Sequence, residues 1–124
     1  MKIIEDYVSF EVAKLLRKKG FDEKCRAVYK EKNLRINTLR DYLNSELSSY
    51  VCAPTHQMAC KWLREVHYIY ADAIKQGNYN DCSEYYTWIV ARMGIIHRNP
   101  SVADKFSYEE AVEAALKYAL ENLI

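Results

Sequence analysis

Glycine and proline are scarce in this sequence, with three and two residues among 124. Disordered and loop-dominated chains are rich in both, so their scarcity argues against that class. Half of the residues are hydrophobic and 28% are charged, as in ordinary globular proteins. A chain of this length can bury a core without disulfides. We therefore expect one folded domain over residues 1–124.

Long apolar runs are also missing. No stretch reaches the roughly 18 apolar residues that a membrane helix needs, so we expect no membrane partner. The first residues, M-K-I-I-E-D-Y, lack the apolar segment and cleavage site of a secretory signal. These features predict a cytoplasmic protein. Reduced thiols are the rule there, and we expect them at the four cysteines, Cys25, Cys52, Cys60 and Cys82.

The sequence has no familiar catalytic or metal-binding motif. No two cysteines form C-x-x-C, and G-x-G-x-x-G, G-x-x-x-x-G-K-[ST], H-E-x-x-H and G-x-S-x-G are all missing. Three glycines make a phosphate-cradling loop a poor expectation. We therefore predict no catalytic residue, no metal and no cofactor, we identify no small-molecule substrate, and we expect that the protein is not an enzyme.

One stretch, A-P-T-H-Q-M-A-C-K-W-L-R-E-V-H-Y-I-Y at 53–70, does gather histidine and cysteine. Its periodicity predicts an amphipathic helix capped by Thr55. On that helix His56 and His67 lie about 16 Å apart along the axis, too far to share a zinc ion. Cys60 with His56 has the residue types of a nucleophile pair in a hydrolase or transferase, but no glycine-rich turn lies nearby. A buried structural cysteine is the favoured interpretation.

Two further helices carry clear end signals. Residues 9–19 have an apolar stripe, with Ser9 as the first cap and Gly20 where many helices end. Near the C-terminus, Ser107 and Glu110 form an S-x-x-E capping box ahead of a long apolar run.

Between the helices, turn signals separate segments rich in β-branched and aromatic residues. The segments predicted as strands are 25–30, 34–37, 67–75 and 84–93. Residues 38–50 fit a short helix less well, and 94–100 reads as an exit turn with a strand edge. The order α-ββ-α-ββ-α predicts an α+β fold, a four-stranded antiparallel sheet with packed helices.

Tyrosine is over-represented, at 11 of 124 residues. Period-two alternation places Tyr68 and Tyr70 on one strand face, and Tyr86 and Trp88 on one face of the partner strand. If these faces coincide, they form an aromatic platform suited to a protein partner or a second copy. The alternative is that helices cover these residues as core. Our first hypothesis is a protein-interaction or self-association module.

Charge is unevenly distributed. Residues 1–40 carry 11 Lys and Arg against 6 Asp and Glu, a net of +5, and the remainder carries 7 against 11, a net of −4. A basic half can bind phosphates, so the alternative is a nucleic-acid-binding accessory protein. Its candidate residues are Lys14, Arg17, Lys18, Lys24 and Arg26. The plainer interpretation is a solvated surface.

Three phrases carry a family resemblance: Y-V-S-F-E-V-A-K-L-L-R-K-K-G-F-D-E (7–23), C-A-P-T-H-Q-M-A-C-K-W-L-R-E-V-H (52–67) and S-Y-E-E-A-V-E-A-A-L-K-Y-A-L-E-N-L-I (107–124). With them the chain resembles a family of small uncharacterised proteins of Bacteroides-type gut bacteria, their prophages and mobile elements. The resemblance weakens over 31–50 and 76–100. It implies a cytoplasmic, mobile-element-borne or phage-related accessory protein, and it transfers no activity, cofactor or site residue.

Overall fold

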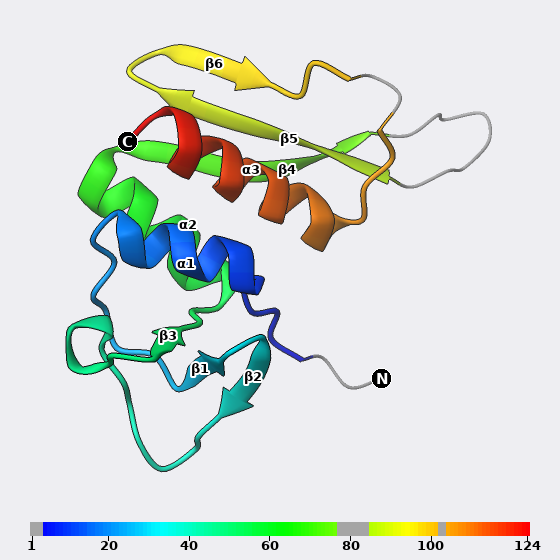
Figure 1. Cartoon of the computed structure of the whole chain (residues 1–124). Helices are drawn as coiled ribbons and strands as arrows, with labels where there is room; N and C mark the ends of the chain where they lie inside the picture. Colours follow the sequence, from blue (N-terminus) through cyan, green and yellow to red (C-terminus); the bar gives the residue numbers. More distant parts are fainter. Residues whose placement is uncertain (1–3, 77–84, 102–103) are drawn as a thin grey trace. The chain divides into compact units, whose positions relative to one another are not determined.

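The structure is a computed structural model that describes residues 4–76, 85–101 and 104–124. Internal contacts divide the chain into two compact units, residues 1–59 and 60–124. The elements, in chain order, are α1 (Phe10–Lys18), β1 (Ala27–Lys30), β2 (Asn33–Ile36), the 3-10 turn η1 (Asn44–Glu46), β3 (Tyr50–Cys52), α2 (His56–His67), β4 (Ile69–Gln76), β5 (Tyr85–Arg92), β6 (Ile95–Arg98) and α3 (Tyr108–Asn122) (Figure 1). The division between the units falls within α2, so each unit is described by itself.

Helix α1 forms where its cap and stop residues predict it. The Ser9 hydroxyl accepts a hydrogen bond from the Val12 amide at 3.2 Å, which satisfies one free donor of the first turn. Gly20 follows the helix with φ of +96°, a conformation that residues with a side chain rarely adopt. The Phe21 amide then donates to the Leu16 carbonyl at 2.9 Å and closes the helix end. This confirms the predicted helix and its end signals.

The first unit contains a three-stranded antiparallel sheet in the order β2-β1-β3. Val28 at its centre lies opposite Arg35 on one side and Cys52 on the other. The Tyr29 hydroxyl donates to the Val8 carbonyl at 2.7 Å and ties β1 to the segment that leads into α1. The buried apolar side chains around this sheet include Val8, Val12, Leu16, Phe21, Val28 and Cys52.

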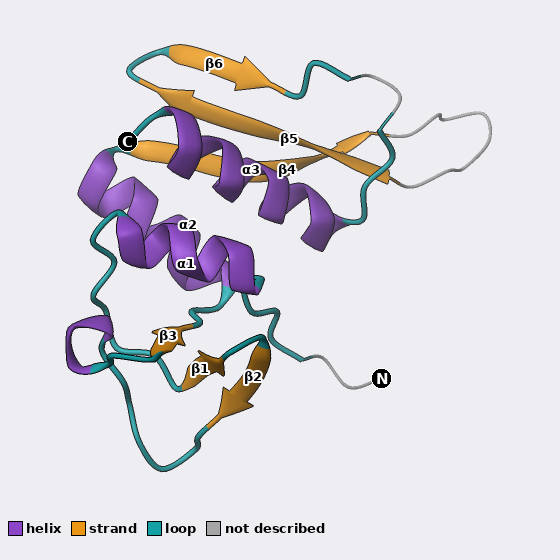
Figure 2. Cartoon of the chain, in the orientation of Figure 1, coloured by secondary structure: helices purple, strands orange, loops and turns teal. Residues whose placement is uncertain are grey.

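The second unit contains another three-stranded antiparallel sheet, in the order β4-β5-β6 (Figure 2). A two-residue loop, Met93–Gly94, joins β5 to β6, with φ of +52° and +81°. Two positive φ values are the hallmark of the type I′ turn, whose twist matches that of a hairpin. Gly94 supplies one of them without steric cost.

Helix α3 packs against β4 and β5 of this sheet. Its capping box is complete, since the Glu110 amide donates to the Ser107 hydroxyl at 3.1 Å and the Ser107 amide donates to the Glu110 carboxylate at 2.9 Å. Its stripe toward the sheet is fully buried and mixes alanines with larger side chains: Ala111, Val112, Ala115, Leu116, Ala119 and Leu120. The predicted capping box and buried stripe are confirmed.

The predicted single four-stranded sheet is wrong. Each predicted hairpin recruits a third strand, β3 or β6, and the two sheets remain separate. Both added strands are very short, at three and four residues. A strand of that length shows little alternation in sequence, because it owes its geometry to pairing with a neighbour.

The ambiguous segment 38–50 forms only the short turn η1 and leads into β3 at Tyr50. Its conformation depends on distant partners rather than on helix propensity. Tyr42 exchanges two backbone hydrogen bonds with Cys25, at 2.9 and 2.7 Å. The predicted exit turn at 94–100 likewise contains a true strand, β6. Among the described residues, no helix has the length and apolar character to cross a membrane.

Candidate functional site

The β4-β5-β6 sheet has one covered face and one open face. Residues that lie opposite each other in antiparallel strands point to the same side of the sheet, so the register assigns every side chain to a face. The covered face includes four buried residues, Ile69, Ala71, Trp88 and Val90. We call the other side the open face, formed by Tyr70, Asp72, Ile74, Gln76, Tyr85, Thr87, Ile89, Ala91, Ile96 and Arg98, none of which is buried.

Two of the four predicted platform residues belong to the covered face. Trp88 is only 7% exposed, and its ring lies 4.8 Å from that of Tyr118 on α3. Tyr86 is half-buried and meets the ring of Tyr108 edge-on at 5.4 Å. Helix α3 therefore uses both residues as packing partners.

The other two platform residues lie elsewhere. Tyr70 is opposite Ala91 and belongs to the open face. Tyr68 precedes β4 with φ of +56° and is 79% exposed. The structure therefore does not bring Tyr68, Tyr70, Tyr86 and Trp88 onto one surface. The reason is the register, which places Tyr70 and Trp88 on opposite sides of the sheet.

A cluster of hydroxyl groups surrounds Asp72 on β4, which is an outer strand of its sheet. The Asp72 carboxylate accepts hydrogen bonds from the Tyr70 hydroxyl at 3.0 Å and the Tyr108 hydroxyl at 3.1 Å. It also accepts from the Ala73 amide at 2.7 Å. An unpaired backbone amide at a sheet edge can pair with another strand. Here the Asp72 carboxylate occupies one such amide, that of Ala73.

The charge of Asp72 also influences the titration of its neighbours. The hydrogen bond to Asp72, followed by burial, raises the pKa of Tyr70. Burial, followed by the charge of Asp72, raises the pKa of Tyr108 to about 12. Both phenols therefore stay protonated at neutral pH and remain donors to the carboxylate.

The charge of the Asp72 carboxylate also affects the pKa of Cys60 on α2. Burial and the charge of Asp72 raise the pKa of Cys60 to about 11, although nearby Arg64 acts in the opposite direction. The thiolate is the nucleophilic form of cysteine, and a pKa this high leaves almost none at neutral pH. This raised pKa disfavours Cys60 as the nucleophile of the hydrolase or transferase interpretation.

The two histidines of α2 lie at its two ends. The His56 amide donates to the Asp6 carbonyl at 2.8 Å, and the His67 ring lies edge-on to Trp62 at 4.7 Å. Thr55 caps the helix, accepting from the Met58 amide at 3.2 Å, as predicted. In the ranges 4–76, 85–101 and 104–124, no three His, Cys, Asp or Glu side chains are placed to hold a metal ion.

The remaining described cysteines form a buried pair in the first unit. The Cys52 thiol donates to the Tyr42 carbonyl at 3.5 Å, and the Cys25 amide donates to that same oxygen at 2.9 Å. The hydrogen bond with Cys52 and burial raise the pKa of Cys25. Both residues are free cysteines. Cys82 lies outside the described residues.

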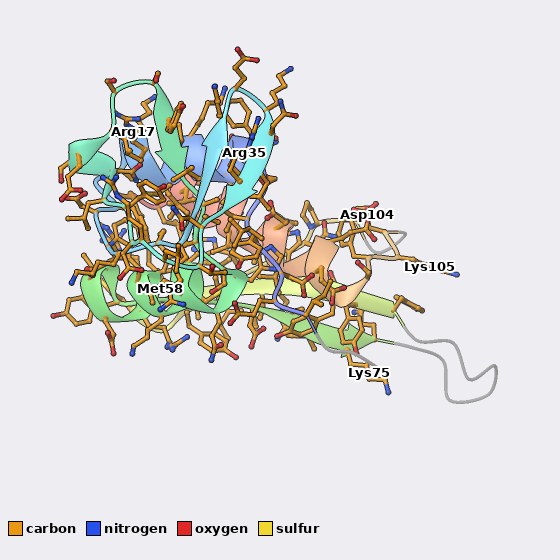
Figure 3. All side chains as sticks on the ribbon, turned by 90° about the horizontal axis from the view of Figure 1, so that it is seen from below. Arg17, Arg35, Met58, Lys75, Asp104 and Lys105 are labelled. Carbon is orange, nitrogen blue, oxygen red and sulfur yellow. The ribbon has the colours of Figure 1, made fainter. Side chains whose placement is uncertain are left out.

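The predicted basic residues are partly used within the first unit. The Arg17 guanidinium donates to the Tyr50 and Leu47 carbonyls, both at 2.6 Å, and so holds the segment before β3. Figure 3 labels the Arg17 side chain. Arg26 approaches Asp41 at 3.5 Å, and the Lys14 ammonium lies 4.9 Å from the centre of the Phe10 ring.

The other two predicted basic residues, Lys18 and Lys24, are exposed. Lys18 belongs to the last turn of α1, where the helix dipole favours cations. Local structure therefore accounts for much of the basic cluster without a ligand.

Sequence reasoning missed most of the open face. Asp72 stands on β4, a strand that the sequence predicts, while Ile96 and Arg98 stand on β6, within the segment 94–100 predicted as an exit turn with a strand edge. Period-two alternation in β4 and β5 is enough to assign Ile74 and Ile89 to a face of their own strands. The pairing of Ile89 with Arg98 depends on the register between β5 and β6, which the sequence does not predict. No protein-family model, no curated protein and no solved structure matches this chain.

Proposed function

We propose that this protein is a non-enzymatic binding module that recognises another protein through the open face of the β4-β5-β6 sheet. The observation that carries the proposal is the contrast between the two faces. On the covered face α3 buries Ile69, Ala71, Trp88 and Val90, while the open face leaves Tyr70 46%, Ile74 38% and Ile96 53% exposed.

The composition of this face suits a protein partner. Apolar side chains lie on all three strands of this face, and Tyr70, Ala91 and Ile96 are neighbours across it. Exposed apolar surface of this kind on soluble proteins marks interaction sites. Tyrosine and isoleucine give contact area at low entropic cost, and the acidic and basic residues lie at the outer strands. An apolar centre with a polar border is the usual anatomy of a protein interface.

The supporting geometry also favours binding over catalysis. The Asp72 carboxylate already accepts three hydrogen bonds from Tyr70, Tyr108 and Ala73, which hold the side chain in place. A fixed charge beside an apolar surface improves selectivity for a partner with a matching cation.

Site-specific photo-crosslinking in the native cell tests the proposal. A photoreactive phenylalanine analogue replaces Ile96 on the open face, or, as a matched exposed control, Glu121 on α3. We expect a defined protein adduct from position 96 and none from position 121, and mass spectrometry then identifies the adduct. Equal labelling from both positions would contradict a specific open-face interface.

A third probe at Lys18 separates this proposal from the nucleic-acid alternative. Lys18 is exposed and belongs to the basic set of the first unit. A nuclease-sensitive adduct from position 18, with no protein adduct from position 96, would move the binding activity to the basic residues and overturn the proposal.

A further inference from the structure

We propose that Cys25 and Cys52 are a redox-sensitive pair, which a low-molecular-weight disulfide of the glutathione class oxidises reversibly to an intramolecular disulfide that stabilises the first unit. Both residues belong to this unit, so the pair is independent of the open face of the second unit and of the function proposed for it. The structure shows the reduced form, in which both cysteines are free. The packing of the two thiols against each other and around one carbonyl group supports the proposal.

The two cysteines meet beside the first sheet. Cys25 precedes β1, and Cys52 ends β3, which pairs with β1 through Val28. The Tyr42 carbonyl accepts from the Cys25 amide at 2.9 Å and from the Cys52 thiol at 3.5 Å, so one oxygen atom joins both residues. The two side chains also form a hydrogen bond with each other. Thiols in such contact are close enough to form a disulfide after a local adjustment.

Access to the pair depends on β3. Cys52 is fully buried and Cys25 is only 5% exposed, so an oxidant reaches them when the surrounding structure opens. Strand β3 has three residues and is an outer strand of its sheet. Short outer strands open more readily than the centre of a core, because few backbone hydrogen bonds hold them. Opening of β3 exposes Cys52.

The surroundings give the two thiols different roles. The hydrogen bond from Cys25 lowers the pKa of Cys52, and the positive charge of Arg17 acts in the same direction against the effect of burial. The same hydrogen bond, together with burial, raises the pKa of Cys25. Because the thiolate is the nucleophile, Cys52 attacks the oxidant and Cys25 reacts in the second step.

The oxidation consists of two exchanges. The Cys52 thiolate attacks one sulfur of oxidised glutathione, forms a mixed disulfide and expels one glutathione thiolate. Cys25 then loses its proton and attacks the Cys52 sulfur, which expels the second glutathione thiolate and completes the Cys25–Cys52 bond. The protein gives up two electrons and two protons, which reduce the oxidant to two glutathione thiols.

The disulfide closes residues 26–51 into one loop. This loop contains β1, β2, η1 and most of β3, so the bond joins the two ends of the first sheet region. A closed loop has less freedom in the unfolded chain, so we expect oxidation to raise the melting temperature by about 5–10 °C. The Ala53 amide, which donates to the Ala27 carbonyl beside the bond, should exchange its hydrogen at least about tenfold more slowly.

The experiment uses the full chain with Cys60→Ser and Cys82→Ser, which leaves Cys25 and Cys52 as its only thiols. The folded protein is equilibrated in mixtures of reduced and oxidised glutathione and quenched with acid, and its mass and tryptic peptides are then measured. We expect a mass loss of about 2 Da and a linked Cys25–Cys52 peptide, at least half formed at about 1 mM of each glutathione form. Excess reduced glutathione should restore both thiols.

Single substitutions in the same background separate the two roles. Cys25→Ser keeps a hydroxyl donor beside Cys52 and should retain glutathione on Cys52, with a mass gain of about 305 Da. Cys52→Ser leaves the less acidic thiol, so its adduct should form at least about tenfold more slowly. Neither variant should gain melting temperature on oxidation.

Glutathione adducts on the separate cysteines, with no Cys25–Cys52 bond, would overturn the proposal. So would a pair that stays reduced in about tenfold more oxidised glutathione. A disulfide that leaves the melting temperature and the Ala53 exchange unchanged would overturn its stabilising role, and equal adduct rates in the single variants would overturn Cys52 as the attacking thiol. The linked peptide is mapped without substitution at Cys25 or Cys52, so a misfolded variant cannot decide the result.

Discussion

The Tyr108 hydroxyl on α3 donates a hydrogen bond to the Asp72 carboxylate on β4 over 3.1 Å. This contact joins the first turn of the helix to an outer strand of the sheet that it covers. The same carboxylate accepts from Tyr70, a residue of the open face. Asp72 thereby connects the packing of the covered face with the surface proposed to bind a partner.

The contact predicts a pH dependence of stability in alkaline solution. Burial and the Asp72 charge raise the pKa of Tyr108 to about 12, against about 10 in an unfolded chain. Between these values the unfolded chain binds fewer protons, so the free energy of unfolding falls as the pH rises from about 10 to about 12. Tyr108→Phe should remove this part of the decline, as measured by urea unfolding at several pH values.

The matched control for that prediction is Tyr68→Phe. Tyr68 is largely exposed and its hydroxyl has no partner among the described residues. Its substitution should leave the alkaline slope at the wild-type value. Identical slopes for wild type and Tyr108→Phe would contradict the assigned contact.

We expect the basic residue Arg17 to stabilise the folded protein through its internal hydrogen bonds, without any ligand. Its guanidinium donates to two carbonyl groups, those of Leu47 after η1 and Tyr50 at the start of β3. Arg17→Met should lower the free energy of unfolding by about 1–2 kcal/mol, because both acceptors lose a charged donor. Lys18→Met, with the same loss of charge at an exposed neighbour, should change it by less than about 0.5 kcal/mol. Equal effects would show that charge alone matters there.

We expect a larger loss of unfolding free energy from substitution of Asn44, because this residue is buried and both the nitrogen and the oxygen of its side-chain amide form hydrogen bonds. The nitrogen donates to the Phe21 carbonyl at 2.8 Å, and the oxygen accepts from the Cys52 amide at 3.0 Å. Asn44→Ala leaves two buried backbone groups unsatisfied and should cost about 2–3 kcal/mol in chemical unfolding. Ser45→Ala, next to it and exposed, is the control. A cost below about 1 kcal/mol would mean that water replaces the amide.

Cys60 predicts a slow reaction with thiol reagents in the native protein. A pKa of about 11 leaves roughly one thiolate in ten thousand at pH 7, against a few per cent in the unfolded chain. Peptide mapping after iodoacetamide should therefore show Cys60 modified about a hundredfold more slowly in buffer than in urea. Equal rates in both conditions would restore Cys60 as a candidate nucleophile.

Local signals were sufficient for the helices of this protein. Ser9, Thr55 and Ser107 each cap the helix that follows, because a cap needs only a side-chain oxygen and an amide two or three residues along the chain. The core strands of both hairpins were also recognisable from composition. These features depend on neighbours in the sequence, so the sequence alone determined them.

Strand register and sheet membership were decided only in the tertiary structure. Tyr70 and Trp88 alternate correctly within their own strands, yet they lie on opposite faces because Tyr70 pairs with Ala91 and Trp88 with Ala73. A two-residue loop would set such a register, but residues 77–84 separate these strands. A shift of one residue exchanges the faces, and only packing against α3 selects the observed one. The row from Asp72 through Ile89 to Arg98 exists for the same reason, since three separate segments must pair before it forms.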